Sequence, residues 1–299
     1  MSLKKVTDEA GDTLTLLDVD GFLFAPDLPE DVIRGLRHFP FRDDDVMVCS
    51  YPKSGCHWVW EILRMLQEET IDVAVHEKEG LMMEWRTPEF MDKFPSPRVL
   101  NNHVLLRHLN PELFSKKIKI VMVVRNPKDV AVSFYHHHKK LVEYEYNGQF
   151  TNYVRNYLDG KVDSCCVFDY TRDWEKEIEE HPAHPILLLC YEDMKENLFH
   201  EVKKIGNFLG KSFEDAFYQK IADKCTFSKM RDRKGAVHKE LENNIFYRKG
   251  EVGDWKNWFT VAQSEWCDRI CEEKMAGSKI RFRYTLDNNR ETNNNDTGS

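Results

Sequence analysis

The most constraining feature of the sequence is a short apolar run that leads through a tight turn into a helical pattern. Residues 46–49 (VMVC) are typical of a strand that is buried on both faces. Pro52 and Gly55 mark the turn that follows. From Trp58 to Leu66, apolar residues recur at helical spacing, with charged residues between them. The pattern therefore predicts a buried strand, a tight turn and a helix that begins close to Gly55.

This turn has the features of an anion-binding site. The first turn of a helix leaves backbone N–H groups unpaired and carries the positive end of the helix dipole. Lys53 adds a positive charge, Ser54 adds a hydroxyl donor, and Gly55 lets the backbone approach an anion closely. We expect the anion to be a phosphate. The stretch taken alone leaves open an ordinary turn with a solvated lysine, and it does not match the GxxxxGK[ST] loop of nucleotide triphosphatases.

Three further apolar runs predict strands of the same sheet. They cover residues 98–104, 118–124 and 186–191, and helical patterns lie between them. Strands that alternate with helices predict a mainly parallel sheet in an α/β domain, with the functional groups at the carboxyl ends of the strands. The residues at such ends are Lys53, His103, Arg125 and Tyr191, and Ser133 lies on the helix that follows Arg125.

The flanking segments predict one domain, residues 13–286, between two loose ends. The polar residues 1–12 are expected to be flexible, and residues 287–299, which contain no apolar side chain, are expected to be disordered. Edge strands are expected at residues 13–19 and 22–24, and helices at 31–36, 197–209, 213–225 and 265–275. A basic loop region is expected to carry Arg231, Arg233, Lys234, Lys239, Arg248 and Lys249.

Composition restricts the partners and the compartment. The net charge of −8 and the isoelectric point near 5.9 argue against nucleic acid as the main partner, since such binding needs basic surface. The eight cysteines include no CxxC pair, which favours a reducing compartment. The N-terminus lacks the apolar core of a signal peptide, and no segment approaches about 18 consecutive apolar residues. We therefore expect a cytoplasmic protein that does not bind a membrane.

Four separated stretches resemble one family, the cytosolic sulfotransferases. They are residues 51–58 (YPKSGCHW), 125–133 (RNPKDVAVS), 191–197 (YEDMKEN) and 248–257 (RKGEVGDWKN), and the similarity extends from Pro29 to Ala276. The resemblance implies a P-loop-like α/β fold, with a central, mainly parallel sheet flanked by helices on both faces. It also implies in-line transfer of a sulfuryl group from 3′-phosphoadenosine 5′-phosphosulfate (PAPS) to an acceptor hydroxyl or amine, without a metal, leaving 3′-phosphoadenosine 5′-phosphate (PAP).

The resemblance implies roles for particular residues. His103 is similar to the family's catalytic base, Lys53 to the cation that neutralises the bridging oxygen, and Ser133 to the serine that pairs with Lys53 until both substrates are bound. The implied donor site consists of Lys53, Ser54, Gly55, Cys56, His57, Trp58, Arg125, Ser133, Tyr191, Cys225, Phe227, Arg248, Lys249 and Gly250. Within this set, adenine is expected to pack among Trp58, Tyr191 and Phe227.

The acceptor is expected to be small and largely apolar, and the sequence does not identify it. The expected pocket residues are Phe22, Phe24, Met83, Trp85, Phe90 and Phe150. The residues alone leave open whether the aromatic and methionine-rich run 81–85 (LMMEW) packs in the core or lines this pocket, with core packing favoured.

Two other segments bear on a partner and on a metal. Residues 256–265 (KNWFTVAQSE) resemble the family's short dimer motif, which implies a homodimer, whereas an ordinary loop that enters a helix capped near Thr260 would need only the threonine and the glutamate. The run of histidines at residues 136–138 cannot bind one metal ion, because consecutive helical side chains point in different directions. We expect a partly exposed helix there, with one histidine close to the acceptor pocket.

The chain departs from the family pattern at several positions. Cys56 and His57 stand where two threonines are usual, Asn101 replaces a lysine, and Cys225 replaces a threonine whose hydroxyl Thr226 could supply. A protonated His57 would partly substitute for the lost hydroxyls. Cys56 at a helix N-terminus could have a lowered pKa, although an inert buried thiol is the favoured interpretation. These departures keep open a donor-binding protein with weak or no catalysis, and the missing GK[ST] disfavours a third class, the nucleotide kinases.

Overall fold

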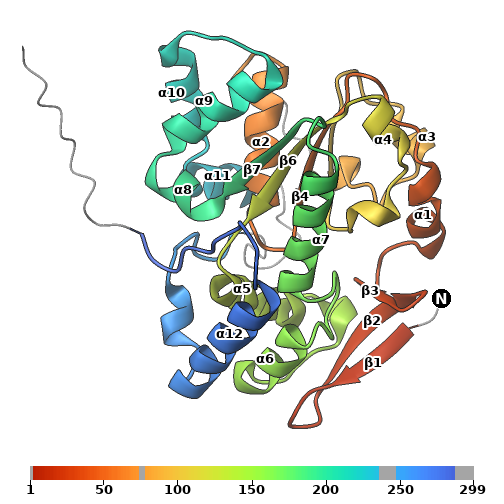
Figure 1. Ribbon diagram of the computed structural model, residues 1–299, viewed down its shortest axis with the longest axis vertical. Coiled ribbons are helices and arrows are strands. Elements are labelled where there is room, and N and C mark those ends of the chain that lie inside the picture. The colour runs from red at the N-terminus through yellow and green to blue at the C-terminus, as the bar shows by residue number, and fades with distance from the viewer. Residues whose placement is uncertain (1–2, 74–77, 236–246, 287–299) are drawn as a thin grey trace, which may run out of the picture.

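The central sheet is parallel and has four strands. The computed structural model describes residues 3–73, 78–235 and 247–286. The sheet has the order β5-β4-β6-β7, and its strands are β4 (Val46–Ser50), β5 (Val99–Asn102), β6 (Lys119–Val124) and β7 (Ile186–Cys190). The sequence predicted all four, but β7 ends one residue early because Tyr191 begins a helix. Figure 1 shows β4, β6 and β7 in the middle of the molecule.

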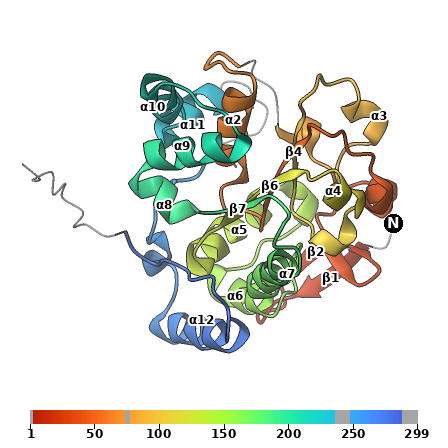
Figure 2. The ribbon, with the colours of Figure 1, turned by 45° about the horizontal axis from the view of Figure 1, so that its top comes forward.

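Helices cover both faces of this sheet, as the sequence predicted. Figures 1 and 2 show α2 with α8 to α11 on one side and α5, α6, α7 and α12 on the other. The helices on the first side are α2 (Cys56–Gln67), α8 (Tyr191–Glu196), α9 (Leu198–Leu209), α10 (Asp215–Lys224) and α11 (Phe227–Gly235). Those on the second are α5 (Pro127–Lys140), α6 (Phe150–Leu158), α7 (Val167–Glu180) and α12 (Val261–Lys274).

Each face of the sheet builds its own hydrophobic core. Successive residues of a strand point to opposite faces. Val46 and Val48 of β4 therefore pack in the core with α2, α9 and α10, whereas Met47 and Cys49 pack in the core with α5, α6 and α7. This burial on both sides explains why the strands read as continuous apolar runs.

Short elements complete the described chain. The short α-helices are α1 (Glu30–Gly35), α3 (Pro88–Met91) and α4 (Glu112–Ser115). The 3₁₀ helices are η1 (Leu36–His38), η2 (Lys78–Leu81), η3 (Leu106–His108), η4 (Val142–Tyr144) and η5 (Asp254–Asn257). None of the helices in the described ranges is long and apolar enough to cross a membrane.

The N-terminal region differs from the prediction. Leu3–Thr7 forms strand β1, which pairs with β2 (Thr13–Val19), and β2 pairs with β3 (Phe22–Phe24) in a separate antiparallel sheet. The flexible start predicted for residues 1–12 is thus wrong for β1. Of the two predicted edge strands, β3 is an edge of this sheet, whereas β2 is its middle strand. Only Val6 of β1 is buried, so backbone pairing holds this strand and its side chains give little apolar signal.

Two predictions toward the C-terminus also need correction. Arg231, Arg233 and Lys234 lie on helix α11 rather than in a basic loop, and α12 begins at Val261, four residues before the predicted start. Thr260 accepts a hydrogen bond from the backbone N–H of Gln263 and so caps α12. Lys239 and the tail 287–299 lie outside the described residues.

Candidate active site

The turn after β4 is held in a strained, open shape. Lys53 has a φ of 67° and Gly55 a φ of 113°, both in the left-handed region. A Cβ atom at Gly55 would lie 2.9 Å from the ring of Tyr191, so only glycine fits there. A lysine in this region is uncommon and costs of the order of 1–3 kcal/mol, which the surrounding structure must offset. Such strain is typical of a functional turn.

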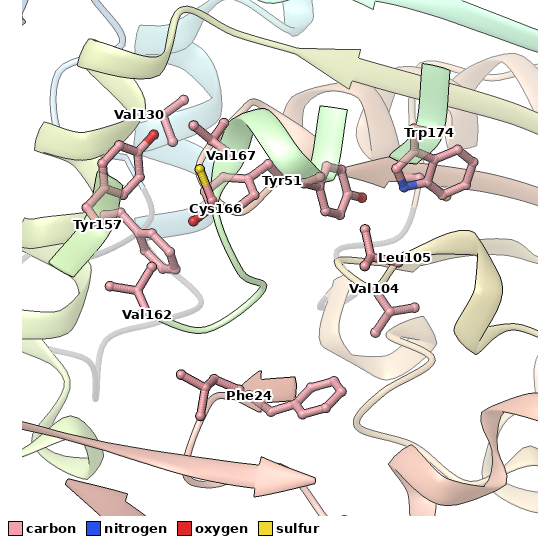
Figure 3. Packing of buried hydrophobic residues seen from close by; sticks show 14 of the residues in the cluster. Phe24, Tyr51, Val104, Leu105, Val130, Tyr157, Val162, Cys166, Val167 and Trp174 are labelled. Atoms are coloured by element: carbon pink, nitrogen blue, oxygen red, sulfur yellow. The ribbon is translucent and has the colours of Figure 1, made fainter. Parts of the chain in front are cut away.

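Tyr51 anchors the start of the turn in the core. Its hydroxyl donates to the Cys165 carbonyl at 2.8 Å, and its ring packs against Phe134, Tyr157 and Tyr170. Figure 3 shows Tyr51 within this buried cluster. The anchor fixes the backbone from which Lys53 projects.

A second turn, after β6, brings a distant segment to the same place. Asn126 caps α5 by accepting from the Asp129 N–H at 2.8 Å. The buried Asp129 carboxylate accepts from the N–H groups of Gly253 at 2.7 Å and Trp255 at 3.0 Å. Asp129 thereby ties the segment after residue 247 to the carboxyl end of the sheet.

Three cations from these segments, Arg125, Arg248 and Lys249, line the same cavity. Arg125 donates to the carbonyls of Lys53 and Glu251, both at 3.1 Å, and its guanidinium lies 4.1 Å from the centre of the Tyr191 ring. Arg248 and Lys249 each contact the Asp254 carboxylate at 2.6 Å. Burial alone would raise the pKa of Asp254, but hydrogen bonds from the two cations hold that pKa at about 2.

One cavity of about 360 Å³ collects most of the predicted donor residues. Those that line it are Lys53, Gly55, Cys56, His57, Trp58, Arg125, Ser133, Tyr191, Phe227, Arg248, Lys249 and Gly250, together with His103. Two predicted residues do not line it. Ser54 is buried beneath the turn, and Cys225 is buried against Met65, although the Cys225 carbonyl accepts a 2.8 Å hydrogen bond from the Trp58 indole.

The predicted acceptor pocket is only partly assembled. Phe24 and Trp85 line the cavity. The other four lie elsewhere: Phe22 packs on His108, Met83 is fully buried beside Asn102, Phe90 is exposed beside Phe94, and Phe150 packs between Tyr135 and Trp258. The run 81–85 divides between the two possibilities left open, because Leu81 and Met83 belong to the core whereas Met82, Glu84 and Trp85 line the cavity.

His103 is oriented as a hydrogen-bond acceptor toward the cavity. Its Nδ1 lies 2.8 Å from the Ser50 carbonyl, which can only accept, so Nδ1 carries the proton and Nε2 keeps its lone pair. Burial, with the Lys78 charge, lowers the pKa of His103 to about 3, so the ring is neutral near pH 7. Its backbone N–H donates to the Glu84 carboxyl at 2.8 Å, and burial raises the pKa of Glu84 to about 7.

Lys53 has a histidine partner that the sequence did not indicate. Its Nζ lies 3.5 Å from Nδ1 of His137, which also lines the cavity with Ser133. Burial and the charges of Arg125 and Lys78 lower the pKa of Lys53 to about 7. Burial, with the Lys53 charge, lowers the pKa of His137 well below its usual value. The run of three histidines thus contributes one member to the cavity, whereas His138 is buried against Asp163 at 2.7 Å.

Two hypotheses about the substituted residues Cys56 and His57 are wrong. Burial raises the pKa of Cys56, so the activated thiolate is wrong and the inert buried thiol is the better description. Burial also lowers the pKa of His57 to about 4, so this imidazole is neutral near pH 7 and is not the protonated substitute considered above. His57 Nε2 lies 2.9 Å from the Glu79 carboxylate; burial alone would raise the pKa of Glu79, but the hydrogen bond with His57 and the charge of Lys78 lower it.

Comparison with known proteins identifies the family. The family model of the sulfotransferase domain matches residues 43–279. The chain belongs to the sulfotransferase family. Human Sulfotransferase 1C2 is 33% identical over 93% of this chain and 98% of its own length, and canine Sulfotransferase 1B1 is 36% identical over 85% and 90%. The crystal structure of mouse sulfotransferase SULT7A1 complexed with PAP matches with a TM-score of 0.75, at 30% identity, over 88% of this chain and 96% of that one.

Sequence reasoning on this sulfotransferase missed a pair of charged residues. Lys78 and Glu79, the first residues of η2, line the cavity. No local sequence pattern predicts that these two residues line the cavity, because their position depends on the contact between η2 and β5. Within the described ranges, no group of three or more His, Cys, Asp and Glu residues is arranged to hold a metal ion.

Proposed function

We propose that this sulfotransferase transfers a sulfuryl group from PAPS to a hydroxyl or amine of a small, largely apolar acceptor by in-line displacement. The observation that carries the proposal is the single cavity in which the Lys53 turn, His103 and the Arg125, Arg248 and Lys249 cations meet. A bisphosphorylated donor needs cations at two separated points, and an in-line reaction needs a base on the acceptor side.

The chain's own groups fit such a donor. The buried Nε atoms of Arg125 and Arg248 have no hydrogen-bond partner among the described residues, as expected of cations that await an anion. A Cβ atom at Gly250 would lie 2.1 Å from the Phe227 ring, so the backbone there is kept close to an aromatic surface. We propose that these residues, with Ser133 and Lys249, hold the 3′-phosphate, and that Trp58, Tyr191 and Phe227 pack around adenine.

The turn and His103 account for the chemistry. PAPS supplies a sulfuryl group on a phosphosulfate anhydride. The acceptor oxygen forms a bond to sulfur, the bond from sulfur to the 5′-phosphate oxygen breaks, and the electron pair of that bond stays on PAP. Lys53 neutralises the charge that develops on this oxygen, and Nε2 of His103 takes the acceptor's proton. A preorganised donor at such a point is worth about 10² to 10³ in rate.

A donor-binding protein with weak catalysis is the second candidate. It is favoured by the neutral His57 and the buried Cys56, because the hydroxyls usual at these positions would donate to the phosphosulfate. Hydrogen bonds to a charged group are each worth about 1.5–3 kcal/mol, so their loss would slow transfer unless other groups replace them.

The deciding experiment follows ³⁵S-labelled sulfuryl transfer from PAPS to a panel of phenols, alcohols and amines. We expect transfer by the wild-type protein, and at least 10²-fold less by His103→Ala. The control is His200→Ala, since His200 is 70% exposed on α9. Equal transfer by wild type and His103→Ala would remove His103 from the mechanism, and PAP binding without any transfer would favour the second candidate. Thermal shifts with PAP against ATP separate both from a nucleotide kinase.

We also propose a homodimer through residues 256–265. Val261, directly after the Thr260 cap, is an apolar side chain that is 76% exposed. Light scattering of Val261→Asp tests the proposal, because a charge at this position should shift a dimer toward the monomer, and an unchanged mass would contradict it.

A further inference from the structure

Segment η2 is fixed to the carboxyl end of β5 by a reciprocal pair of side-chain hydrogen bonds. The Lys78 ammonium donates to Oδ1 of Asn101 at 2.7 Å, and Nδ2 of Asn101 donates to the Lys78 carbonyl at 2.9 Å. Farther along, the N–H of Met83 donates to the Asn101 carbonyl at 2.9 Å. These hydrogen bonds to Asn101 of β5 fix the position of the Lys78 ammonium relative to the central sheet.

The ammonium is buried at the cavity with few partners. Lys78 is 2% exposed and lines the cavity with Lys53, His57 and His103. Within the described ranges, Asn101 and the Met82 sulfur, at 4.0 Å, are the hydrogen-bond partners of its Nζ. The charge of Lys78 also acts on the carboxyl groups of Glu79 and Glu84, but neither of these two described residues forms an ion pair with the ammonium. An ammonium has three donors, and burying one without an anion is unfavourable. The arrangement thus favours an anionic ligand beside Lys78.

The charge of Lys78 is felt across the reacting groups. Burial is the main cause of the lowered pKa of Lys53 and of His103, and the charge of Lys78 adds to both shifts. Asn101, which accepts from Lys78, lies two residues before His103, so the ammonium belongs to the His103 side of the cavity and not to the adenosine end. The next residue, Glu79, holds His57, so consecutive residues of η2 support two substituted positions, His57 and Asn101.

We propose that Lys78 is a catalytic residue whose ammonium binds an oxygen of the sulfuryl group while it passes from PAPS to the acceptor. The proposal rests on the proposed function and adds a cation to it. As the acceptor oxygen bonds to sulfur and the 5′-phosphate oxygen leaves with its electron pair, the transferring group keeps its three oxygens, and Lys78 stabilises the charge on them. Nε2 of His103 receives the acceptor's proton, and the Lys78 ammonium keeps its three protons throughout the step.

The competing role is structural, in which Lys78 only joins η2 to Asn101. Lys78→Gln distinguishes the two, because its amide can still donate to Oδ1 of Asn101 but carries no charge. Lys78→Met removes both the donor and the charge. Lys220→Met on α10 is the matched control, since Lys220 is exposed and does not line the cavity.

The first measurement compares the affinities of PAPS and PAP by titration calorimetry and needs no acceptor. A cation on the sulfuryl group predicts that Lys78→Gln and Lys78→Met weaken PAPS at least tenfold, while PAP, which lacks that group, changes less than threefold. Equal weakening of both ligands, or of neither, would overturn the proposal. Failure of the wild-type protein to bind PAP would instead refute the proposed function.

The second measurement is sulfuryl transfer to the acceptor identified in the panel. We expect Lys78→Gln and Lys78→Met to lose about 10²-fold in kcat, and Lys220→Met to match wild type. The double variant Lys78→Ala/Asn101→Lys returns an ammonium to the same place from β5 and should recover at least tenfold over Lys78→Ala. Wild-type kcat in Lys78→Gln, or no recovery in a double variant that binds PAP normally, would show that Lys78 is structural.

Discussion

Asp129 carries a prediction that follows directly from the geometry of the donor site. Its carboxylate accepts from the backbone N–H groups of Gly253 and Trp255 and from the Asn126 side chain, at 2.7, 3.0 and 2.8 Å. In Asp129→Asn, the side-chain amide presents an NH₂ group to one of these donors. One charge-assisted hydrogen bond is lost and a buried N–H is left unsatisfied, which costs about 2 kcal/mol. The segment that carries Arg248 and Lys249 is then released from the sheet.

If donor binding requires this segment to be docked, the free energy lost in Asp129→Asn weakens the binding of PAP by the same amount. About 2 kcal/mol corresponds to roughly a 30-fold rise in the Kd of PAP by titration calorimetry. Hydrogen exchange should show faster exchange at the Gly253 and Trp255 amides in the same variant. The control is Asp268→Asn, since Asp268 is 48% exposed and forms its ion pair with Lys128, whereas the Gly253 and Trp255 amides donate to Asp129. An unchanged Kd with faster exchange would refute the link between docking and donor binding.

Three further predictions concern reactivity, pH and stability. Iodoacetamide should label Cys56, which is buried and has a raised pKa, more slowly than the half-buried Cys271, and faster labelling of Cys56 in mass spectra would contradict its inert role. Lys53 has a pKa of about 7 without ligand and must be protonated to neutralise an anion, so the Kd of PAP should be level below pH 7 and rise up to about tenfold per pH unit above it. Lys53→Arg should abolish this dependence, and a flat wild-type profile to pH 9 would contradict the assignment. Asp45→Ala removes the buried carboxylate that pairs with the fully buried Arg98 at 2.7 Å and leaves Arg98 only the exposed Asp92 at 3.1 Å, so it should lower the free energy of unfolding in urea by about 3 kcal/mol, whereas exposed Asp44→Ala should change it little.

The central sheet could be predicted because its strands are buried on both faces. Residues 46–49 and 120–124 therefore read as unbroken apolar runs, and their connections contain helical patterns. Strand β1 gave no such signal, since it is held by backbone pairing and exposes four of its five side chains. Helix α11 was equally hidden, because it consists largely of charged residues and shows little apolar periodicity.

The donor side of the site was more predictable than the acceptor side. Lys53, Arg125 and Arg248 belong to motifs whose turns place them at one edge of the sheet, so their type and spacing carried the information. The acceptor side depends on which way side chains of irregular segments point. Trp85 lines the cavity, whereas Met83, two residues earlier, is buried in the core, and no local pattern distinguishes them.

The effect of the departures from the family pattern on the site could not be predicted from each substituted residue alone. Asn101 and His57 indicated the loss of polar contacts to the donor. The structure brings Lys78 to Asn101 and Glu79 to His57, from a connection whose sequence gave no reason to place it there. Charged residues from a distant segment thus contact the substituted positions, and the sequence alone does not show which segments lie side by side.

A crystal structure with bound PAP tests the central claim most directly. The account predicts the 5′-phosphate against the turn at residues 53–57 and the 3′-phosphate between Arg125 and Arg248, with His103 and Lys78 facing the side from which an acceptor enters. PAP bound outside this cavity, or a 3′-phosphate that contacts neither arginine, would contradict it.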